Sequence, residues 1–210
     1  MNKKDRAQVV AEVNILRSLK HPNIVRYCDR IVDKQASRLY IIMEFCRGGD
    51  LALLIKNYRR KRAWISEDFI WKMIAQITSA LKHCHRYTTD QGSLRPVLHR
   101  DLKPANILLD HNMDAKLCDF GLADVLTSSS NSSMKVSSSL STEVEATGMS
   151  MGTPFYMSPE RVNNCKYDER SDIWSVGCIV YELASLSPPF EACNHVDLAA
   201  KINSGKVAEL

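Results

Sequence analysis

Residues 99–106 read His-Arg-Asp-Leu-Lys-Pro-Ala-Asn, and the prediction of the fold starts from these residues. The tripeptide Asp119-Phe120-Gly121 follows it after residues 107–118, in which two apolar segments flank a polar turn. Such a pattern predicts a short β-hairpin. The hairpin would hold Asn106, at its start, close to Asp119, at its end. The sequence therefore predicts one site that gathers two carboxylates, an ammonium group and an amide.

These groups suit the transfer of a phosphoryl group that is held by a metal ion. The carboxylate of Asp101 can accept the proton of an attacking hydroxyl group. Lys103 can neutralise charge on the transferring phosphate. Asn106 and Asp119 supply oxygen ligands of the kind that Mg²⁺ takes. The stretch thus indicates a chemical site as well as a structural one.

The composition excludes several other classes of protein. A net charge of +4 on 210 residues is too small to indicate nucleic-acid binding. No stretch approaches the roughly 20 apolar residues of a membrane span, so we expect no membrane partner. Seven cysteines without a repeating spacing are typical of reduced, intracellular thiols. His83-Cys84-His85 is better interpreted as the end of an amphipathic helix than as a metal site.

Periodicity outside the central stretch predicts a mixture of helices and strands. The run 56–62 is strongly basic, and it is interpreted either as the solvated end of a helix or as a patch for nuclear import or an acidic partner. Residues 127–150 are rich in Ser and Thr, and we expect them to be mobile. The expected helices are 6–20, one that opens at 51, one from 67 to about 86 that is capped by Ser66, 168–185 and 196–202, and the expected strands are 24–32 and 39–45.

The motifs resemble those of the eukaryotic protein kinases and, within them, the NIMA-related serine/threonine kinases. The kinase-wide motifs are HRDLKPAN (99–106), DFG (119–121), a Ser-Pro-Glu at 158–160 and SDIWSVGC (171–178). The motifs typical of the NIMA-related branch are EVNILRSLKHPNIVRYCDRIVD (12–33), MEFCRGGDLALLI (43–55) and GTPFYMSPE (152–160). The resemblance covers nearly the whole chain apart from the Ser-rich segment.

The resemblance implies a role for each matching position. Asp101 corresponds to the catalytic base, Lys103 to the residue that contacts the γ-phosphate, and Asn106 and Asp119 to the Mg²⁺ ligands. The positions expected around the nucleotide are Glu44 and Cys46 for adenine, Asp50 for the ribose and Leu108 beneath the adenine ring. Asp172 is expected to hold the backbone of the 99–106 loop from the helix that contains it.

Regulatory roles are implied at further positions. Glu12 corresponds to the helix-C glutamate that pairs with the ATP-binding lysine, and Met43 to the gatekeeper. Phe120 and His99, with Leu16 and Tyr27, are expected to form the apolar stack that joins two lobes. Arg100 is expected to bind a phosphate on Thr147 or Ser150, and Thr153 is expected to lie near Asp101 and Lys103.

The expected fold is α+β, protein-kinase-like and two-lobed. Residues 1–45 would form a partial N-terminal lobe, with helix C and two strands, and 46–210 a mainly helical C-terminal lobe. No Gly-rich loop precedes Gly48, and Lys3 and Lys4 lie too close to Glu12 to be its lysine partner. We therefore expect a domain that is truncated at both ends and lacks its C-terminal helices, that binds ATP poorly and that leaves Glu160 without its usual arginine partner.

The expected function is transfer of the γ-phosphoryl group of ATP to Ser or Thr of protein substrates, with ATP and Mg²⁺ as cofactors. The alternative is a catalytically impaired fragment or pseudokinase that acts as a binding or scaffold module. The resemblance implies a cytoplasmic location, with the nucleus and the centrosome as further alternatives. It indicates neither the substrate nor the oligomeric state.

Overall fold

The computed structural model describes residues 13–33, 35–36, 38–88, 92–94, 96–120, 124–125 and 154–209, and for 124–125 it describes only the backbone. Four predicted regulatory positions, Glu12, Thr147, Ser150 and Thr153, lie outside these residues, as does the Ser-rich segment 127–150. Residues 13–18 are helical; the elements that follow are β1 (Tyr27–Asp33), β2 (Arg38–Met43), α2 (Leu51–Lys61), α3 (Glu67–His85), β3 (Val97–Leu98), a 3-10 turn (Pro104–Asn106), β4 (Ile107–Leu109), β5 (Ala115–Leu117), β6 (Asp124–Val125), α4 (Pro159–Val162), α5 (Arg170–Ser185) and α6 (His195–Ser204).

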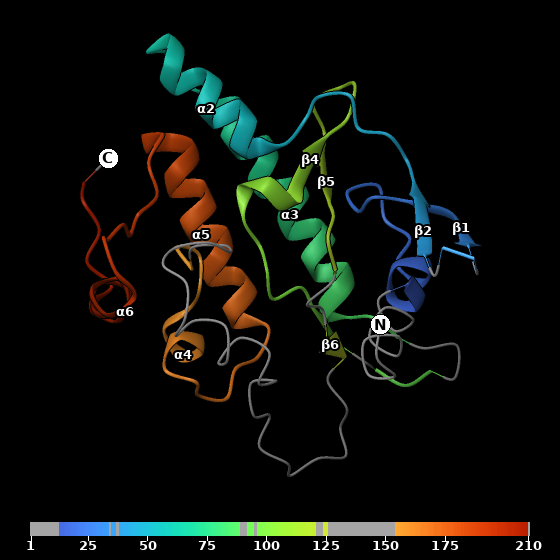
Figure 1. The fold of residues 1–210 in the computed structure, drawn as a ribbon. Coiled ribbons are helices and arrows are strands. Elements are labelled where there is room, and N and C mark those ends of the chain that lie inside the picture. Colours follow the sequence, from blue (N-terminus) through green and yellow to red (C-terminus); the bar gives the residue numbers. More distant parts are fainter. Residues whose placement is uncertain are drawn as a thin grey trace.

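Helices α3 and α5 lie at the centre of the molecule, with α2 at one end of the pair and α6 beside α5 (Figure 1). Ser66 caps α3 as predicted, because its hydroxyl accepts the N–H of Phe69 at 3.4 Å. Both helices contribute to one continuous core, and burial of each large apolar side chain stabilises it by about 1.5–3 kcal/mol. The core side chains from the two helices are Met73, Ile77, Ala80, Leu81, Cys84, Val176, Ile179 and Leu183.

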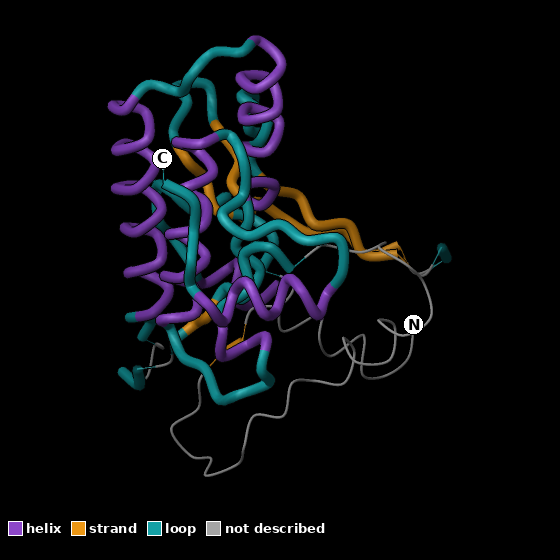
Figure 2. The backbone as a smooth tube through the Cα atoms, turned by 90° about the vertical axis from the view of Figure 1, so that its left-hand side faces the viewer, coloured by secondary structure: helices purple, strands orange, loops and turns teal. Residues whose placement is uncertain are grey.

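The strands form three separate antiparallel pairs, β1–β2, β3–β6 and β4–β5. The β4–β5 pair lies against α3, and its inward side chains, Ile107, Leu109, Ala115 and Leu117, join the same core. The β1–β2 hairpin projects away from the helical body, on the side opposite α4 and α6 (Figures 1 and 2). The mixture of helices and short antiparallel pairs confirms the predicted α+β class.

Both hairpin strands are shorter than the sequence predicts, at the ends that meet the body. β1 begins at Tyr27 because Ile24 and Val25 pack in the core, where the N–H of Val25 donates to the carbonyl of Leu117 at 2.9 Å. β2 ends at Met43 because Glu44 turns back: its N–H bonds the carbonyl of Arg26, and its carboxylate accepts the N–H of Arg26 at 2.8 Å.

The helix predicted to start at 168 starts at Arg170. Asp168 lies just before it, and its carboxylate accepts the N–H of Arg170 at 2.9 Å, so Asp168 satisfies a free donor at the helix entry. Among the described residues, no helix combines the length and apolar content that crossing a membrane needs.

Candidate active site

The β4–β5 hairpin brings the two predicted metal ligands to the same end. Ile107 pairs with Leu117, and one step further the N–H of Cys118 donates to the carbonyl of Asn106 at 3.0 Å. Asn106 therefore lies across from Cys118, the residue that directly precedes Asp119. The β4–β5 hairpin thus brings Asn106 close to the backbone of Asp119, as the sequence predicted.

Asp101 is surrounded by the two partners that the sequence placed with it. The ammonium group of Lys103 lies 2.6 Å from Oδ2 of Asp101. The side-chain nitrogen of Asn106 donates to both the carbonyl oxygen and Oδ2 of Asp101, at 2.8 and 3.0 Å. The side chains of Asp101 and Lys103 are each about one-third exposed, so the carboxylate of Asp101 remains accessible to a hydroxyl group of a substrate. Asp101, Lys103 and Asn106 thus form one contiguous polar cluster.

A buried carboxylate on α5 holds the backbone that carries this cluster. Asp172 accepts the N–H groups of His99 and Arg100, each at 3.0 Å, and lies 2.8 Å from Nε2 of His85. Burial disfavours the ionised form, but the bond from His85, the proximity of His99 and the two N–H groups together hold the pKa of Asp172 below its ordinary value. The predicted role of Asp172 as an anchor of the loop is confirmed.

His99 and Phe120 stack inside the core, with ring centroids 4.8 Å apart. Both are fully buried, and Leu16 and Tyr27 belong to the same apolar cluster, as predicted. Nε2 of His99 lies 3.0 Å from the carbonyl oxygen of Cys118, which fixes the loop against the residue that precedes Asp119. Burial lowers the pKa of His99, although nearby Asp172 favours the charged form. This apolar cluster therefore couples residues 13–33 to the 99–106 loop by packing.

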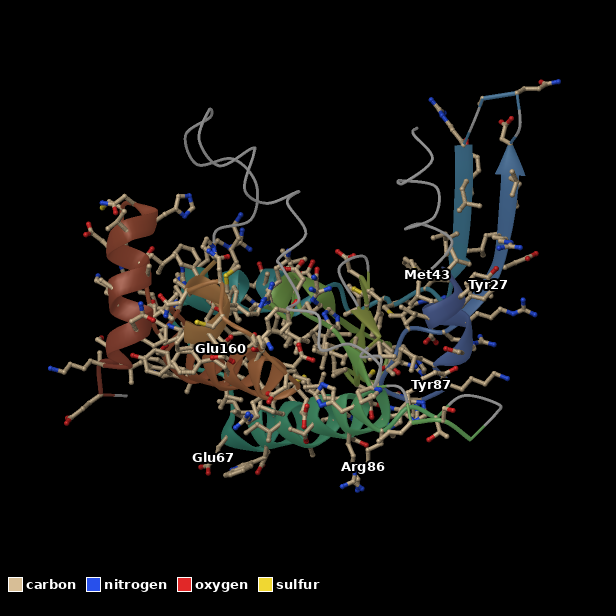
Figure 3. The ribbon with its side chains drawn as sticks, turned by 90° about the horizontal axis from the view of Figure 1, so that it is seen from below. Tyr27, Met43, Glu67, Arg86, Tyr87 and Glu160 are labelled. Atoms are coloured by element: carbon tan, nitrogen blue, oxygen red, sulfur yellow. The ribbon has the colours of Figure 1, made fainter. Side chains whose placement is uncertain are left out.

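The linker between β2 and α2 lies beside the same hairpin. Tyr27 and Met43 face one another at the inner end of β1–β2 (Figure 3). Glu44 is fixed by Lys116, 3.2 Å away on β5. Asp50 caps α2 by accepting the N–H of Leu53 at 2.7 Å, and its backbone pairs with that of Leu108. The linker thus passes directly over β4.

The predicted nucleotide positions consequently share one region of the fold. Leu108 is only partly buried, since it projects from the face of β4 opposite Ile107 and Leu109. Within the described residues, no group bonds the carbonyl of Glu44 or the N–H of Cys46, so both remain available to a ligand. Burial and the nearby Glu44 carboxylate raise the pKa of the Cys46 thiol, which favours its neutral form.

The donor set fits a magnesium ion that is shared with a phosphate. The amide nitrogen of Asn106 is used by Asp101, so the amide oxygen points to the other side of the group. Together with the carboxylate of Asp119, it offers two oxygen ligands. In the described part of the chain, no group of three or more His, Cys, Asp or Glu side chains could hold a metal by itself. Mg²⁺ characteristically binds through one or two protein oxygens, with phosphate and water completing its shell.

The structure also shows contacts that the sequence did not predict. Glu160 accepts a hydrogen bond from the hydroxyl of Ser171 at 2.6 Å, and despite its burial this bond helps to hold the pKa of Glu160 below its ordinary value. The guanidinium of Arg161 bonds the carbonyl of Arg100, and Tyr167 contacts both arginines. No sequence pattern predicts the contacts of Arg100 with Arg161 and Tyr167, because these residues lie more than sixty positions apart in the chain.

Comparisons with known proteins agree with this geometry. Residues 1–208 match the family described as "Protein kinase domain". The chain is 50% identical over 206 residues to "Probable serine/threonine-protein kinase nek2" of Dictyostelium discoideum and 47% identical over 206 residues to "Serine/threonine-protein kinase Nek2" of Homo sapiens. It is 43% identical over 230 residues to "G2-specific protein kinase nimA" of Emericella nidulans. These alignments cover 98%, 98% and 100% of this chain but 44%, 42% and 31% of the three relatives.

Proposed function

Since this chain belongs to the protein kinase family, and within it to the NIMA-related serine/threonine kinases, we propose that it transfers the γ-phosphoryl group of ATP to serine and threonine hydroxyls of proteins. The observation that carries the proposal is the cluster of Asp101, Lys103 and Asn106. It offers a partly exposed carboxylate with an ammonium group and an oriented amide that each lie within hydrogen-bonding distance of it.

Each member of the cluster has a distinct task. Asp101 orients the substrate hydroxyl and accepts its proton as the oxygen attacks phosphorus. Lys103 stabilises the negative charge that spreads over the transferring phosphoryl group. Asn106 and Asp119 would hold Mg²⁺, which would neutralise the charge of the phosphates.

The nucleotide would lie between the linker and β4. The backbone groups of Glu44 and Cys46 would bond adenine, Asp50 would lie near the ribose and Leu108 would pack against the ring. Met43 would border this region as gatekeeper. This assignment is supported by the unengaged backbone groups of the linker and by the outward projection of Leu108.

The regulatory assignments stand as part of the same proposal. Residues 1–45 act as the N-terminal lobe and 46–210 as the C-terminal lobe, joined through the stack that contains Phe120. Glu12 would occupy the helix-C position whose glutamate pairs with the ATP-binding lysine in the family, Thr153 would lie near Asp101, and a phosphate on Thr147 or Ser150 would be recognised by Arg100. Protein substrates are the proposed partners, and the cytoplasm, nucleus or centrosome is the proposed location.

A second candidate function is that of a binding or scaffold module. The observation that favours it is the β1–β2 hairpin, whose strands are mostly exposed and pair with no other described strand. Ile31 and Val32 are 54% and 60% exposed on this hairpin. Contiguous exposed apolar patches mark sites of protein–protein interaction.

A phosphoryl-transfer assay separates the two candidates. The chain is incubated with γ-labelled ATP, Mg²⁺ and peptides that carry Ser, Thr or Tyr, and the labelled amino acid is identified. We expect Mg²⁺-dependent label on Ser and Thr. Replacing Lys103 by Met should lower transfer by about 100-fold, because a charge that stabilises the transition state is lost. Lys206→Met, at an exposed position, is the matched control. Folded protein that transfers no label overturns the kinase proposal and leaves the binding module.

A further inference from the structure

Arg100, the residue before the proposed catalytic base, has a backbone conformation that needs support. Its φ angle is +70°, in the left-handed region that residues with a side chain rarely adopt. Such a conformation is strained and persists only where its surroundings hold it. The position of Asp101 depends on this residue, because the orientation of Asp101 follows from the backbone that leads into it.

The two polar backbone groups of Arg100 bond two different residues. The N–H donates to Oδ1 of Asp172 at 3.0 Å, from α5. The carbonyl oxygen accepts a hydrogen bond from Nη1 of Arg161, from α4. The first partner is a buried carboxylate and the second a partly buried guanidinium, so each bond is charge-assisted.

Tyr167 keeps the guanidinium of Arg161 in place. The Cζ atom of Arg161 lies 5.5 Å from the centroid of the Tyr167 ring, and the Cζ atom of Arg100 lies 5.2 Å from the same centroid. Nη2 of Arg100 also donates to the Tyr167 hydroxyl. Both distances are in the range of cation–π contacts. One aromatic ring therefore fixes two like-charged side chains that would otherwise repel one another.

We propose that Arg161 is a positioning residue for phosphoryl transfer: it holds the carbonyl of Arg100 and so fixes the backbone that presents Asp101. The expected effect of Arg161 on turnover rests on the proposed function, whereas its expected effect on the structure of the 99–106 loop does not. Burial lowers the pKa of Arg161, while the carboxylates of Asp172 and Asp101 favour its charged form, and an arginine remains charged in such surroundings.

The test compares Arg161→Met with Arg161→Lys and with Arg170→Met in the full chain. Met has similar length but no donor, Lys keeps a charge and a donor, and Arg170 is an exposed arginine paired with Asp168 that serves as the control. Hydrogen–deuterium exchange of the peptide that contains residues 99–101 is the first readout. We expect exchange about tenfold faster in Arg161→Met, with Arg161→Lys and Arg170→Met close to wild type.

Turnover is the second readout. We expect kcat to fall by about 10- to 100-fold in Arg161→Met while KM for the peptide stays nearly constant, because a displaced base lowers the rate more than the binding. A chain that phosphorylates no peptide would contradict the proposed function, and the exchange experiment would still decide the role of Arg161.

Two results would overturn the inference. One is exchange of residues 99–101 at the wild-type rate in Arg161→Met. The other is uniformly faster exchange in α3, β4 and β5 as well, which would make Arg161 a general stabilising residue. If Arg161→Met does not fold, Tyr167→Leu removes the ring that orients the guanidinium, and it should accelerate exchange in the same peptide selectively.

Discussion

The candidate site depends on single residues whose conformations the sequence does not reveal. Arg100 and Asp119 both have positive φ angles, +70° and +61°, although neither is a glycine. Each lies next to a functional group: Arg100 precedes Asp101, and Asp119 is itself a proposed metal ligand. Motif resemblance identifies these residues, but it is the bonds from Asp172 and Arg161 that show how one of the two conformations is maintained.

Asp172 gives the residue-scale prediction. Replacing it by Asn removes the charge that pairs with His85 and leaves one of the two N–H groups of the loop without an acceptor. We expect the free energy of unfolding at about pH 7 to fall by about 3 kcal/mol, measured by urea denaturation. Asp68→Asn, at an exposed position on the first turn of α3, should cost less than about 1 kcal/mol.

The same variant has a pH dependence with a defined sign. The pKa of Asp172 is lower in the fold than its ordinary value of 3.8. Its ionised form therefore contributes stability that is complete above 3.8 and is lost as the pH falls through the lower pKa of the folded state. The difference between wild type and Asp172→Asn should be largest near neutral pH and should shrink towards about pH 3. A difference that grows on acidification would contradict this account.

At the scale of elements, local pattern predicts most of what the structure contains. Helices α2, α3, α5 and α6 and the β4–β5 hairpin were predictable from apolar spacing, capping residues and turns. The pairing of residues 23–25 with β5 was not predictable, because it joins segments about ninety residues apart. The short helix α4 was missed for a similar reason, since four residues carry no periodic signal.

The contact between the linker and β4 gives the element-scale prediction. Gly48 donates its N–H to the carbonyl of Leu109 at 2.8 Å, and a Cβ atom at position 48 would lie 2.7 Å from Cβ of Leu109 and 2.9 Å from its carbonyl oxygen. Both obstacles belong to the backbone or lie next to it, so they cannot move aside cheaply. Gly48→Ala should lower the free energy of unfolding by about 1–3 kcal/mol.

Gly177 supplies the matched control for this substitution. It lies in α5, and a Cβ atom there would meet no other atom within 4 Å. Gly177→Ala should therefore be neutral or stabilise the chain by about 0.5–1 kcal/mol, as an alanine does in a helix. Equal unfolding free energies for Gly48→Ala and the wild type would show that the linker does not approach β4 as closely as described.

At the scale of the whole molecule, the chain joins a helical body to a projecting hairpin, with the proposed catalytic loop at the body (Figure 1). The arrangement of Asp101, Lys103 and Asn106 was predictable, because one loop and one hairpin carry all three. Only part of the anchoring of that loop was predictable. Asp172 belongs to a recognisable motif, whereas the contacts of Arg161 and Tyr167 with the loop depend on how the folded chain packs around it. The proposed function therefore depends on contacts that form in the folded chain as well as on the residues of the 99–106 motif.

The turnover of Asp101→Asn relative to wild type tests the central claim most directly. The substitution keeps the size of the side chain and one hydrogen-bonding oxygen but removes the group that accepts the hydroxyl proton. We predict that phosphoryl transfer to Ser/Thr peptides falls by about 10²–10⁴-fold, while the melting temperature and the circular dichroism spectrum stay those of the wild type. Equal transfer rates for the two folded proteins would contradict the assignment of Asp101 as the base.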